Sequence, residues 1–222
     1  EMEKLLENTY RNINIALANE MTIICEKMGI SVWEVIDAAK TKPYGFQAFY
    51  PGPGIGGHCI PLDPYYLAWK AREFDYHTKL IETSGIINDS MPDYVVERAS
   101  KILNRFKKPL NGSNILILGV AYKQDIDDIR QSPALKVIEG FEKKGSVVNY
   151  YDPYVASYDY KGKKRTSVEK LSKQELQNAD LVVITTAHTN IDYDFVQSNS
   201  KFIFDTKNAM KDVRKRENIE LL

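Results

Sequence analysis

The chain has little cysteine, little histidine and no excess of charge. Two cysteines among 222 residues do not make a disulfide framework, which favours a reducing, cytoplasmic location. Thirty basic residues balance thirty acidic residues, so the charge does not indicate a nucleic acid or an anionic membrane as partner. The three histidines show no metal-ligand spacing, and we expect no metal site.

Long apolar runs are also missing. No run approaches the roughly 18 residues of a membrane span, and from its first residues we expect no signal peptide. The proportions that are present, 43% hydrophobic residues with 12 Gly and 9 Pro, exclude collagen-like and disordered classes. The chain starts with EMEKLLENTY, in helical periodicity and without an initiator Met, so we expect it to be part of a longer protein.

Residues 1–106 have the pattern of an all-helical domain. Gly29 is expected to end the first helix, Ser31 to open a shorter one over residues 31–40, and helical pattern resumes at Pro64 and again from about 79 to 103. Spacings of three and four place a row of apolar residues on one face of the first helix. These residues are Leu6, Tyr10, Ile13, Leu17, Met21 and Ile24. Periodicity alone does not say whether this face is core or interface.

Residues 107–222 have the pattern of a small doubly wound α/β domain. The Pro/Gly/Asn segment 107–113 is the predicted boundary. Apolar strand-length runs at 114–119, 147–152, 181–186 and 201–205 alternate with helical segments, which indicates a parallel sheet covered on both faces. Ser132 and Pro133 form a standard helix start.

Cys59 is the first candidate for chemistry. It follows a loop rich in glycine and precedes the helix near Pro64, and a helix N-terminus stabilises the reactive thiolate. Gly54, Gly56 and Gly57 would let the backbone approach a ligand closely. The alternative is a buried structural cysteine beside a tight turn, which is the interpretation we give to Cys25.

Four polar residues accompany this thiol. Asp63 is a candidate base or water-orienting group beside Cys59 and a candidate N-cap of the following helix, two roles that are compatible. Lys4 and Asn8 share one face of the first helix, opposite the apolar row, where they could hold an oxyanion or water or simply face solvent. His58 is either a partner of the thiol or a residue that orders the loop.

The loop after the first predicted strand is a candidate nucleotide site. Ligands of open α/β sheets bind beyond the carboxyl ends of the strands. Lys123 and Arg130 could contact phosphates and Tyr122 a base or ribose, or the segment could be an ordinary surface loop. The loop lacks G-x-G-x-x-G, so it is not a standard dinucleotide motif. The segment DTKNAM, at the end of the last predicted strand, shares this position and ambiguity.

Two long motifs carry a family resemblance. PGPGIGGHCIPLDPYYL and GVAYKQDIDDIRQSPALKVIE resemble the UDP-glucose/GDP-mannose dehydrogenase family, in the right order and across nearly the whole chain. YGFQAFYPGPGIGGHCIP and ETSGIINDSMPDYVVERA look most like its UDP-N-acetylglucosamine 6-dehydrogenase branch. The resemblance implies a central helical dimerisation domain (1–106), a C-terminal UDP-sugar-binding, Rossmann-like domain (107–222), and an NAD-binding domain outside this chain.

The family mechanism implies roles for four side chains. Cys59 would add to a C6 aldehyde as a thiohemiacetal, which is oxidised to a thioester and hydrolysed, with two NAD consumed overall. Lys4 and Asn8 would stabilise oxyanions and position water, and Asp63 would be the acid or base.

The same resemblance implies the binding residues. Tyr122 and Lys123 would contact the sugar nucleotide, Arg130 the nicotinamide cofactor, and Lys42 is the nearest counterpart of an arginine that the partner subunit supplies. Lys207 stands where the family often has arginine. The sugar nucleotide would also contact Tyr50, Pro51, Gly52, Pro53, Gly54, Ile55 and Gly56.

Three hypotheses follow. The first is an NAD-dependent oxidoreductase that oxidises C6 of a UDP-hexose, UDP-N-acetylglucosamine favoured, and acts as a homodimer. The second is a UDP-sugar-binding and dimerising module that has no activity by itself. The third is a UDP-glucose enzyme.

Overall fold

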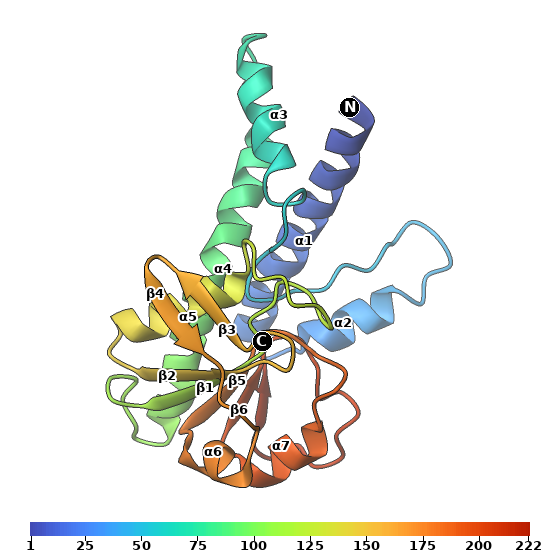
Figure 1. The fold of residues 1–222 in the computed structure, drawn as a ribbon. Helices are drawn as coiled ribbons and strands as arrows, with labels where there is room; N and C mark the ends of the chain where they lie inside the picture. Colours follow the sequence, from blue (N-terminus) through green and yellow to red (C-terminus); the bar gives the residue numbers. More distant parts are fainter. The chain divides into compact units, whose positions relative to one another are not determined.

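The computed structural model describes residues 1–222, which form two compact units, residues 1–91 and 92–222 (Figure 1). The units divide inside one long helix, at Pro92, which has no backbone N–H to donate to the carbonyl one turn earlier. The predicted boundary at 106/107 instead marks the end of that helix at Arg105. The assignment of dimerisation to one part and UDP-sugar binding to the other stays a prediction.

The first unit is helical, as predicted. Gly29 ends the first helix with φ 69°, and the Ser31 hydroxyl accepts the Glu34 N–H at 3.4 Å as the N-cap of the second. The helices of this unit are α1 (Met2–Met28), α2 (Val32–Ala39), α3 (Asp63–Arg72) and the beginning of α4 (Lys79–Arg105).

Helix α1 buries its polar face. Asn12 and Asn19 are 2% and 0% exposed, whereas Leu6 and Leu17 in the predicted apolar row are 67% and 55% exposed. A helix in a monomeric core shows the opposite arrangement. The apolar row therefore lies at the surface of the chain.

Helices α3 and α4 approach closely in the first unit. A Cβ on Gly85 would lie 2.4 Å from the Tyr65 hydroxyl, so a larger residue here would displace the end of the tyrosine side chain. The hydroxyl donates to the Asp89 carboxylate at 3.0 Å. Burial, with the neighbouring carboxylate, raises the pKa of Tyr65 to about 12.

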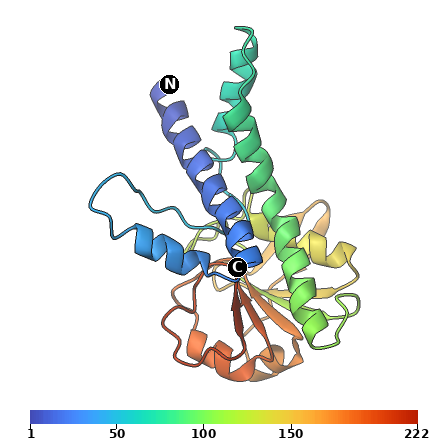
Figure 2. The same cartoon turned by 180° about the vertical axis from the view of Figure 1, so that it is seen from behind.

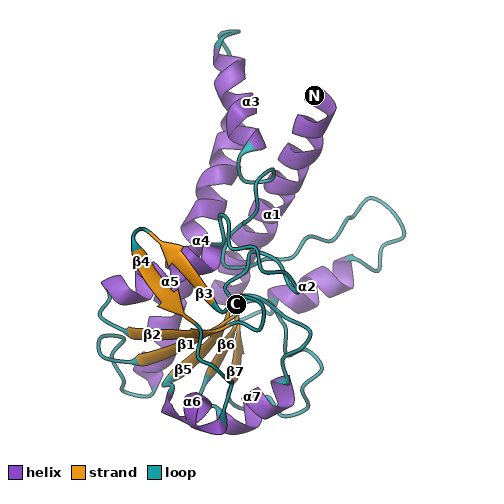
Figure 3. Cartoon of the chain, viewed as in Figure 1, coloured by secondary structure: helices purple, strands orange, loops and turns teal.

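The second unit is built on a parallel sheet, confirming that part of the sequence prediction. Its strand order is β2-β1-β5-β6-β7, and every pair is parallel (Figure 3). The fully buried run of β5 pairs with the equally apolar β1 at the centre. The strands are β1 (Asn114–Leu118), β2 (Val147–Tyr151), β5 (Leu181–Ile184), β6 (Ile203–Asp205) and β7 (Ile219–Leu221).

Helices cover both faces of this sheet. α5 (Pro133–Lys143) packs against the second half of α4, where Gly140 faces Val96. α6 (Lys173–Asn178) and α7 (Tyr193–Asn199) lie together on the other face (Figures 1 and 2). Ser132 is the N-cap of α5 and Pro133 lies in its first turn, as predicted, although the buried Ser132 hydroxyl makes no hydrogen bond.

The hairpin of β3 (Ser157–Tyr160) and β4 (Lys163–Thr166) was not predicted. Its second strand reads KKRT, which has no alternation of apolar and polar residues. Lys161 and Gly162 form the two-residue turn, with φ 50° and 76°. Such a turn requires positive φ at both positions, which glycine adopts without strain.

None of the seven helices combines the length and apolarity that a membrane span needs.

Candidate functional site

Lys4, Asn8 and Asp63 form one cluster in the first unit. The Asn8 side-chain amide donates to Asp63 Oδ2 at 2.7 Å, and Lys4 Nζ lies 3.6 Å from the same oxygen. Asn8 is 4% exposed, so it does not belong to a solvated helix face. An ammonium, an amide and a carboxylate thus meet at one point, the set that oxyanion stabilisation and proton transfer require.

The two interpretations of Asp63 are separated by its contacts. The N-cap of α3 is Leu62, Pro64 occupies the first turn, and no side chain caps the helix. The Asp63 carboxylate bonds to Asn8 instead. The N-cap alternative is therefore wrong, because the Asp63 carboxylate does not cap α3.

Cys59 is an exposed free thiol, whereas Cys25 is buried as predicted. The Cys59 carbonyl accepts the N–H groups of Leu62 and Asp63 at 3.2 and 2.8 Å, which places Cys59 in the turn that opens α3. The alternative of a buried structural cysteine is wrong. Its role as nucleophile stays a prediction.

The loop before Cys59 combines buried and unusual backbone. Pro51, Gly52 and Pro53 are buried, and Gly54 and Gly57 have φ 133° and 88°, which other residues rarely adopt. Gly52, Gly54 and Gly57 have the spacing G-x-G-x-x-G, but no strand precedes them and no helix opens before Asp63, so they are not a dinucleotide motif.

The residues around this loop differ in exposure. Gly56 and Ile55 are half-buried, while Tyr50 is exposed and stacks on Trp33 with ring centroids 5.9 Å apart. Lys42 is exposed. Whether these residues contact a sugar nucleotide stays a prediction.

Sequence reasoning missed a buried polar network next to the cluster. Asn12 and Asn19 on α1 bond to Ser84 and Asn88 on α4, and also to the backbone of the loop that carries Cys59. Their spacing of four and seven residues along the face of Lys4 and Asn8 was the available signal.

A second polar cluster lies at the carboxyl ends of the strands in the second unit. His188 follows β5, is fully buried, and has Nε2 3.1 Å from Asp152 Oδ2. The Asp125 backbone N–H donates to the other ring nitrogen at 3.0 Å. That acceptor position leaves Nε2 to carry the proton and donate to Asp152. No motif in the sequence brings His188 and Asp152 together, because they are 36 residues apart.

This cluster fills the place where a dinucleotide would bind. The backbone N–H groups of Val120 and Ala121 donate to Asp152 Oδ2 at 2.7 and 3.2 Å. In dinucleotide-binding sheets such groups after the first strand face the pyrophosphate. A Cβ on Gly119 would lie 2.7 Å from the Thr186 carbonyl, so the turn after β1 packs closely against the segment after β5. The residues of this crevice do not fit a dinucleotide.

Asp152 stays ionised in this setting. Burial alone would raise its pKa, but hydrogen bonds from His188 and from the N–H groups of Val120 and Tyr154 outweigh burial, and the pKa lies below the ordinary 3.8. The carboxylate therefore holds three loops at the sheet edge.

The loop residues predicted to contact nucleotide or cofactor are at the surface. Lys123 is exposed and Tyr122 is half-buried. The Arg130 guanidinium is paired with the Asp128 carboxylate at 2.6 to 3.1 Å. In DTKNAM, buried Asp205 accepts the N–H groups of Lys207 and Met210, which makes it a turn-stabilising residue.

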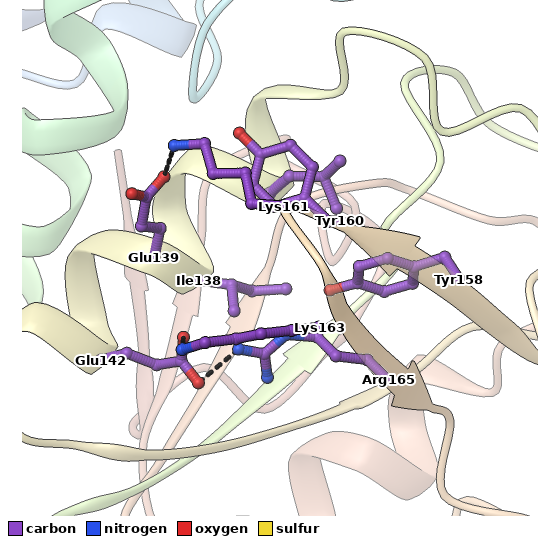
Figure 4. A pocket seen from close by; sticks show the side chains of 9 residues that line it. Ile138, Glu139, Glu142, Tyr158, Tyr160, Lys161, Lys163 and Arg165 are labelled. Carbon is purple, nitrogen blue, oxygen red and sulfur yellow. Dashed lines mark hydrogen bonds and ion pairs between the residues drawn. The ribbon is translucent and has the colours of Figure 1, made fainter.

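One small pocket lies elsewhere in the second unit, between α5 and the β3–β4 hairpin (Figure 4). Its volume of about 70 Å³ is far below the several hundred that a ligand site has. Lys161 pairs with Glu139, and Arg165 with Glu142, across it. These ion pairs, with Tyr158 on the hairpin, explain its polar lining without a ligand.

The two units define a class of protein. A helical unit carries an exposed thiol in the turn that leads to the aspartate of a lysine–asparagine–aspartate cluster, and a parallel α/β unit follows it. Family models match both, namely the UDP-glucose/GDP-mannose dehydrogenase family, central domain, over residues 1–90, and the UDP binding domain of the same family over residues 116–212. The chain belongs to this family.

Curated relatives match nearly the whole chain. It is 40% identical over 218 residues to the UDP-N-acetyl-D-mannosamine dehydrogenase of Methanocaldococcus jannaschii, covering 95% of this chain and 47% of that protein. It is 35% identical over 212 residues to the NDP-N-acetyl-D-galactosaminuronic acid dehydrogenase of Ralstonia nicotianae, covering 93% and 47%. The chain thus spans about half the length of these relatives.

A solved structure confirms the fold. The UDP-D-ManNAc dehydrogenase of Pyrococcus horikoshii superposes with a TM-score of 0.85 at 34% identity, over 100% of this chain and 51% of that one. The expected likeness to UDP-N-acetylglucosamine 6-dehydrogenases is not supported, because these relatives are named for N-acetylmannosamine and N-acetylgalactosaminuronic acid.

Proposed function

We propose that this chain is the thiol-bearing and UDP-binding part of an NAD-dependent dehydrogenase that oxidises C6 of a UDP-N-acetylhexosamine to the carboxylate. The single observation that carries the proposal is the Lys4–Asn8–Asp63 cluster, whose aspartate N–H bonds to the backbone carbonyl of the exposed Cys59. The names of the relatives favour UDP-N-acetyl-D-mannosamine as the substrate. The balanced reaction converts the C6 alcohol, water and two NAD⁺ into a carboxylate, two NADH and three protons.

Each side chain of the cluster has a distinct part in this proposal. The Cys59 thiolate attacks the C6 aldehyde, and the oxygen of the resulting thiohemiacetal becomes negative as it forms. The exposed Lys4 ammonium and the oriented Asn8 amide stabilise that oxygen. Asp63 accepts or returns the proton, and water later hydrolyses the thioester.

The hydride acceptor does not fit this chain's own sheet, since Asp152 uses the N–H groups of the crevice. We place NAD in the part of the full-length protein that corresponds to the remaining length of the relatives. When bound there, two NAD⁺ molecules would accept one hydride each. This chain alone is then expected to produce no NADH.

The second unit is the proposed holder of the UDP group, and its family description supports this. Lys123 is exposed and free to meet a phosphate, and Tyr122 lies beside it. The exposed apolar row of α1 supports a homodimer, because burying Leu6 and Leu17 against a second copy removes apolar surface from water. Both cysteines are free thiols, in keeping with a cytoplasmic protein.

Two experiments test the proposal. Calorimetry of this chain with UDP, UDP-N-acetyl-D-mannosamine and UDP-N-acetylglucosamine should show binding that Lys123→Ala weakens and that Lys211→Ala, at another exposed lysine, does not. Steady-state oxidation by the full-length enzyme should rank the mannosamine sugar first. No binding of any UDP compound would contradict the UDP assignment, and a preference for UDP-glucose would replace the substrate.

A further inference from the structure

One face of α1 contacts both ends of the loop that carries Cys59. Lys4, Asn8, Asn12 and Asn19 are separated by four, four and seven residues. At 3.6 residues per turn they fall within an arc of roughly 80°. We call these four residues the polar face of α1.

The loop runs along this polar face in the opposite direction to the helix. Asn19 Oδ1 accepts the Gly52 N–H at 3.0 Å. Asn12 Nδ2 donates to the Ile60 carbonyl at 3.1 Å. With the bond from Asn8 to the Asp63 carboxylate, the loop is held before and after Cys59.

Helix α4 fixes the orientation of the two asparagines. Asn19 Nδ2 donates to Asn88 Oδ1 at 2.9 Å, so its oxygen is left to face Gly52. Asn88 Nδ2 in turn lies 3.1 Å from the Asn12 carbonyl and 3.4 Å from Asn12 Oδ1. Ser84 Oγ lies 3.0 Å from Asn12 Oδ1 and 2.8 Å from the Ile81 carbonyl of its own helix. The nitrogen of Asn12 is thereby left to face Ile60.

The contacts that hold the loop are shielded from water. Asn12, Asn19, Ser84 and Asn88 are each at most 5% exposed. A buried polar group exchanges partners only at the cost of its desolvation, so a fully paired network has one arrangement. Lys4, by contrast, keeps a side chain that is 63% exposed.

We propose that Asn12 and Asn19 are positioning residues that fix the Cys59 loop against the helix face bearing Lys4 and Asn8. The inference rests on the proposed function, in which Cys59 is the nucleophile. It assigns opposite chemical requirements to the two positions. Position 19 needs an acceptor for the loop, and position 12 needs a donor.

The first test uses this chain and needs no activity. Gly52 lies between two prolines, so its amide is an isolated probe of the loop. Hydrogen exchange, followed by NMR with isotope-labelled glycine, should be at least about tenfold faster in Asn19→Ala. Asn19→Asp keeps the acceptor for Gly52 but loses the bond to Asn88, so its exchange should be slower than in Asn19→Ala. Thr22→Ala is the control, because buried Thr22 bonds only to the Ala18 carbonyl of its own helix.

The second test uses the full-length enzyme. Asn12→Asp and Asn19→Asp bury the same new carboxylate, but only the former loses its loop contact. We expect kcat for acid formation to fall at least about tenfold further in Asn12→Asp, with KM for the UDP-sugar changing less than kcat. If Asn12→Asp does not fold, Ser84→Ala replaces it and should lower kcat severalfold.

Several results would overturn the proposal. These are unchanged Gly52 exchange in Asn19→Ala, equal acceleration by Thr22→Ala, equal kcat in the two aspartate variants, or wild-type kcat in Ser84→Ala. An enzyme that oxidises no UDP-sugar would refute the proposed function alone, because the exchange measurement on Gly52 decides the loop contact by itself.

Discussion

Helices α1 and α5 show opposite relations between polarity and burial. α5 buries Val137 and Phe141 completely, as a helix against a sheet should. α1 buries Asn12 and Asn19 and exposes Leu17. The difference shows that α5 packs its apolar face within its own unit, while α1 buries polar side chains and leaves apolar ones exposed. In the proposed function, the buried face of α1 belongs to the site and the exposed face to a dimer interface.

The largest effect is expected when the Cys59 thiol, in the loop that α1 holds, is removed. Cys59→Ser in the full-length enzyme should lower uronate formation by at least about a thousandfold, since no other group can form the thioester. Product analysis by mass spectrometry measures this. Cys25→Ala is the matched control. Cys25 is the other cysteine, it is buried in α1, and its substitution should leave turnover nearly unchanged. Uronate formation at the wild-type rate would remove Cys59 from the reaction.

A charged substitution on the exposed apolar face of α1 tests the proposed dimer interface. Leu17→Glu should raise the dimer dissociation constant by at least about a hundredfold, because two carboxylates would be buried in a symmetric interface. Light scattering with size-exclusion chromatography measures the mass. Val147→Glu changes a residue of the second unit that is 54% exposed, as Leu17 is 55% exposed, and should leave the dimer intact. A Leu17→Glu protein that remains dimeric would contradict the interface.

In the second unit, the expected effect of a substitution is on the free energy of unfolding. Asp152→Asn removes a carboxylate that accepts from His188, Val120 and Ala121, and should cost about 1–3 kcal/mol at neutral pH. Its folded pKa lies below the ordinary value, so the stabilisation is present above about pH 4 and is lost as pH falls through the folded pKa. The difference between the two proteins should therefore shrink below about pH 4 in denaturant titrations. Asp127→Asn, at an exposed position, is the control; a constant difference down to about pH 2 would contradict the assignment.

The smallest effect is expected at the start of α5. Ser132→Ala removes a buried hydroxyl that has no hydrogen-bond partner and should change the free energy of unfolding by less than about 0.5 kcal/mol. Ser31→Ala removes a hydroxyl that does cap α2 and should cost about 1 kcal/mol. Thermal unfolding of both variants measures the contrast, and an equal loss would mean that Ser132 caps its helix in solution.

The sequence predicted the elements whose signal is local. The caps at Gly29 and Ser31, and the apolar strands at 114–118 and 181–184, each depend on a few neighbouring residues. The shared face of Lys4 and Asn8 follows from their spacing alone.

What could not be predicted depends on residues far apart in the chain. Periodicity places Asn12 and Leu17 on different faces of α1 but does not say which face is buried. Asp152 and His188 meet because two separate strands end at the same edge of the sheet. The expected N-acetylglucosamine sugar is not supported either, because the relatives are named for N-acetylmannosamine and N-acetylgalactosaminuronic acid.

The most direct test of the proposed function measures how many NADH molecules form for each UDP-sugar molecule consumed. The full-length enzyme, mixed with limiting UDP-N-acetyl-D-mannosamine and excess NAD⁺, should form two NADH per sugar consumed and a C6 carboxylate. One NADH per sugar with an aldehyde product, or no oxidation of this sugar, would contradict the proposed thiol-dependent oxidation to the acid.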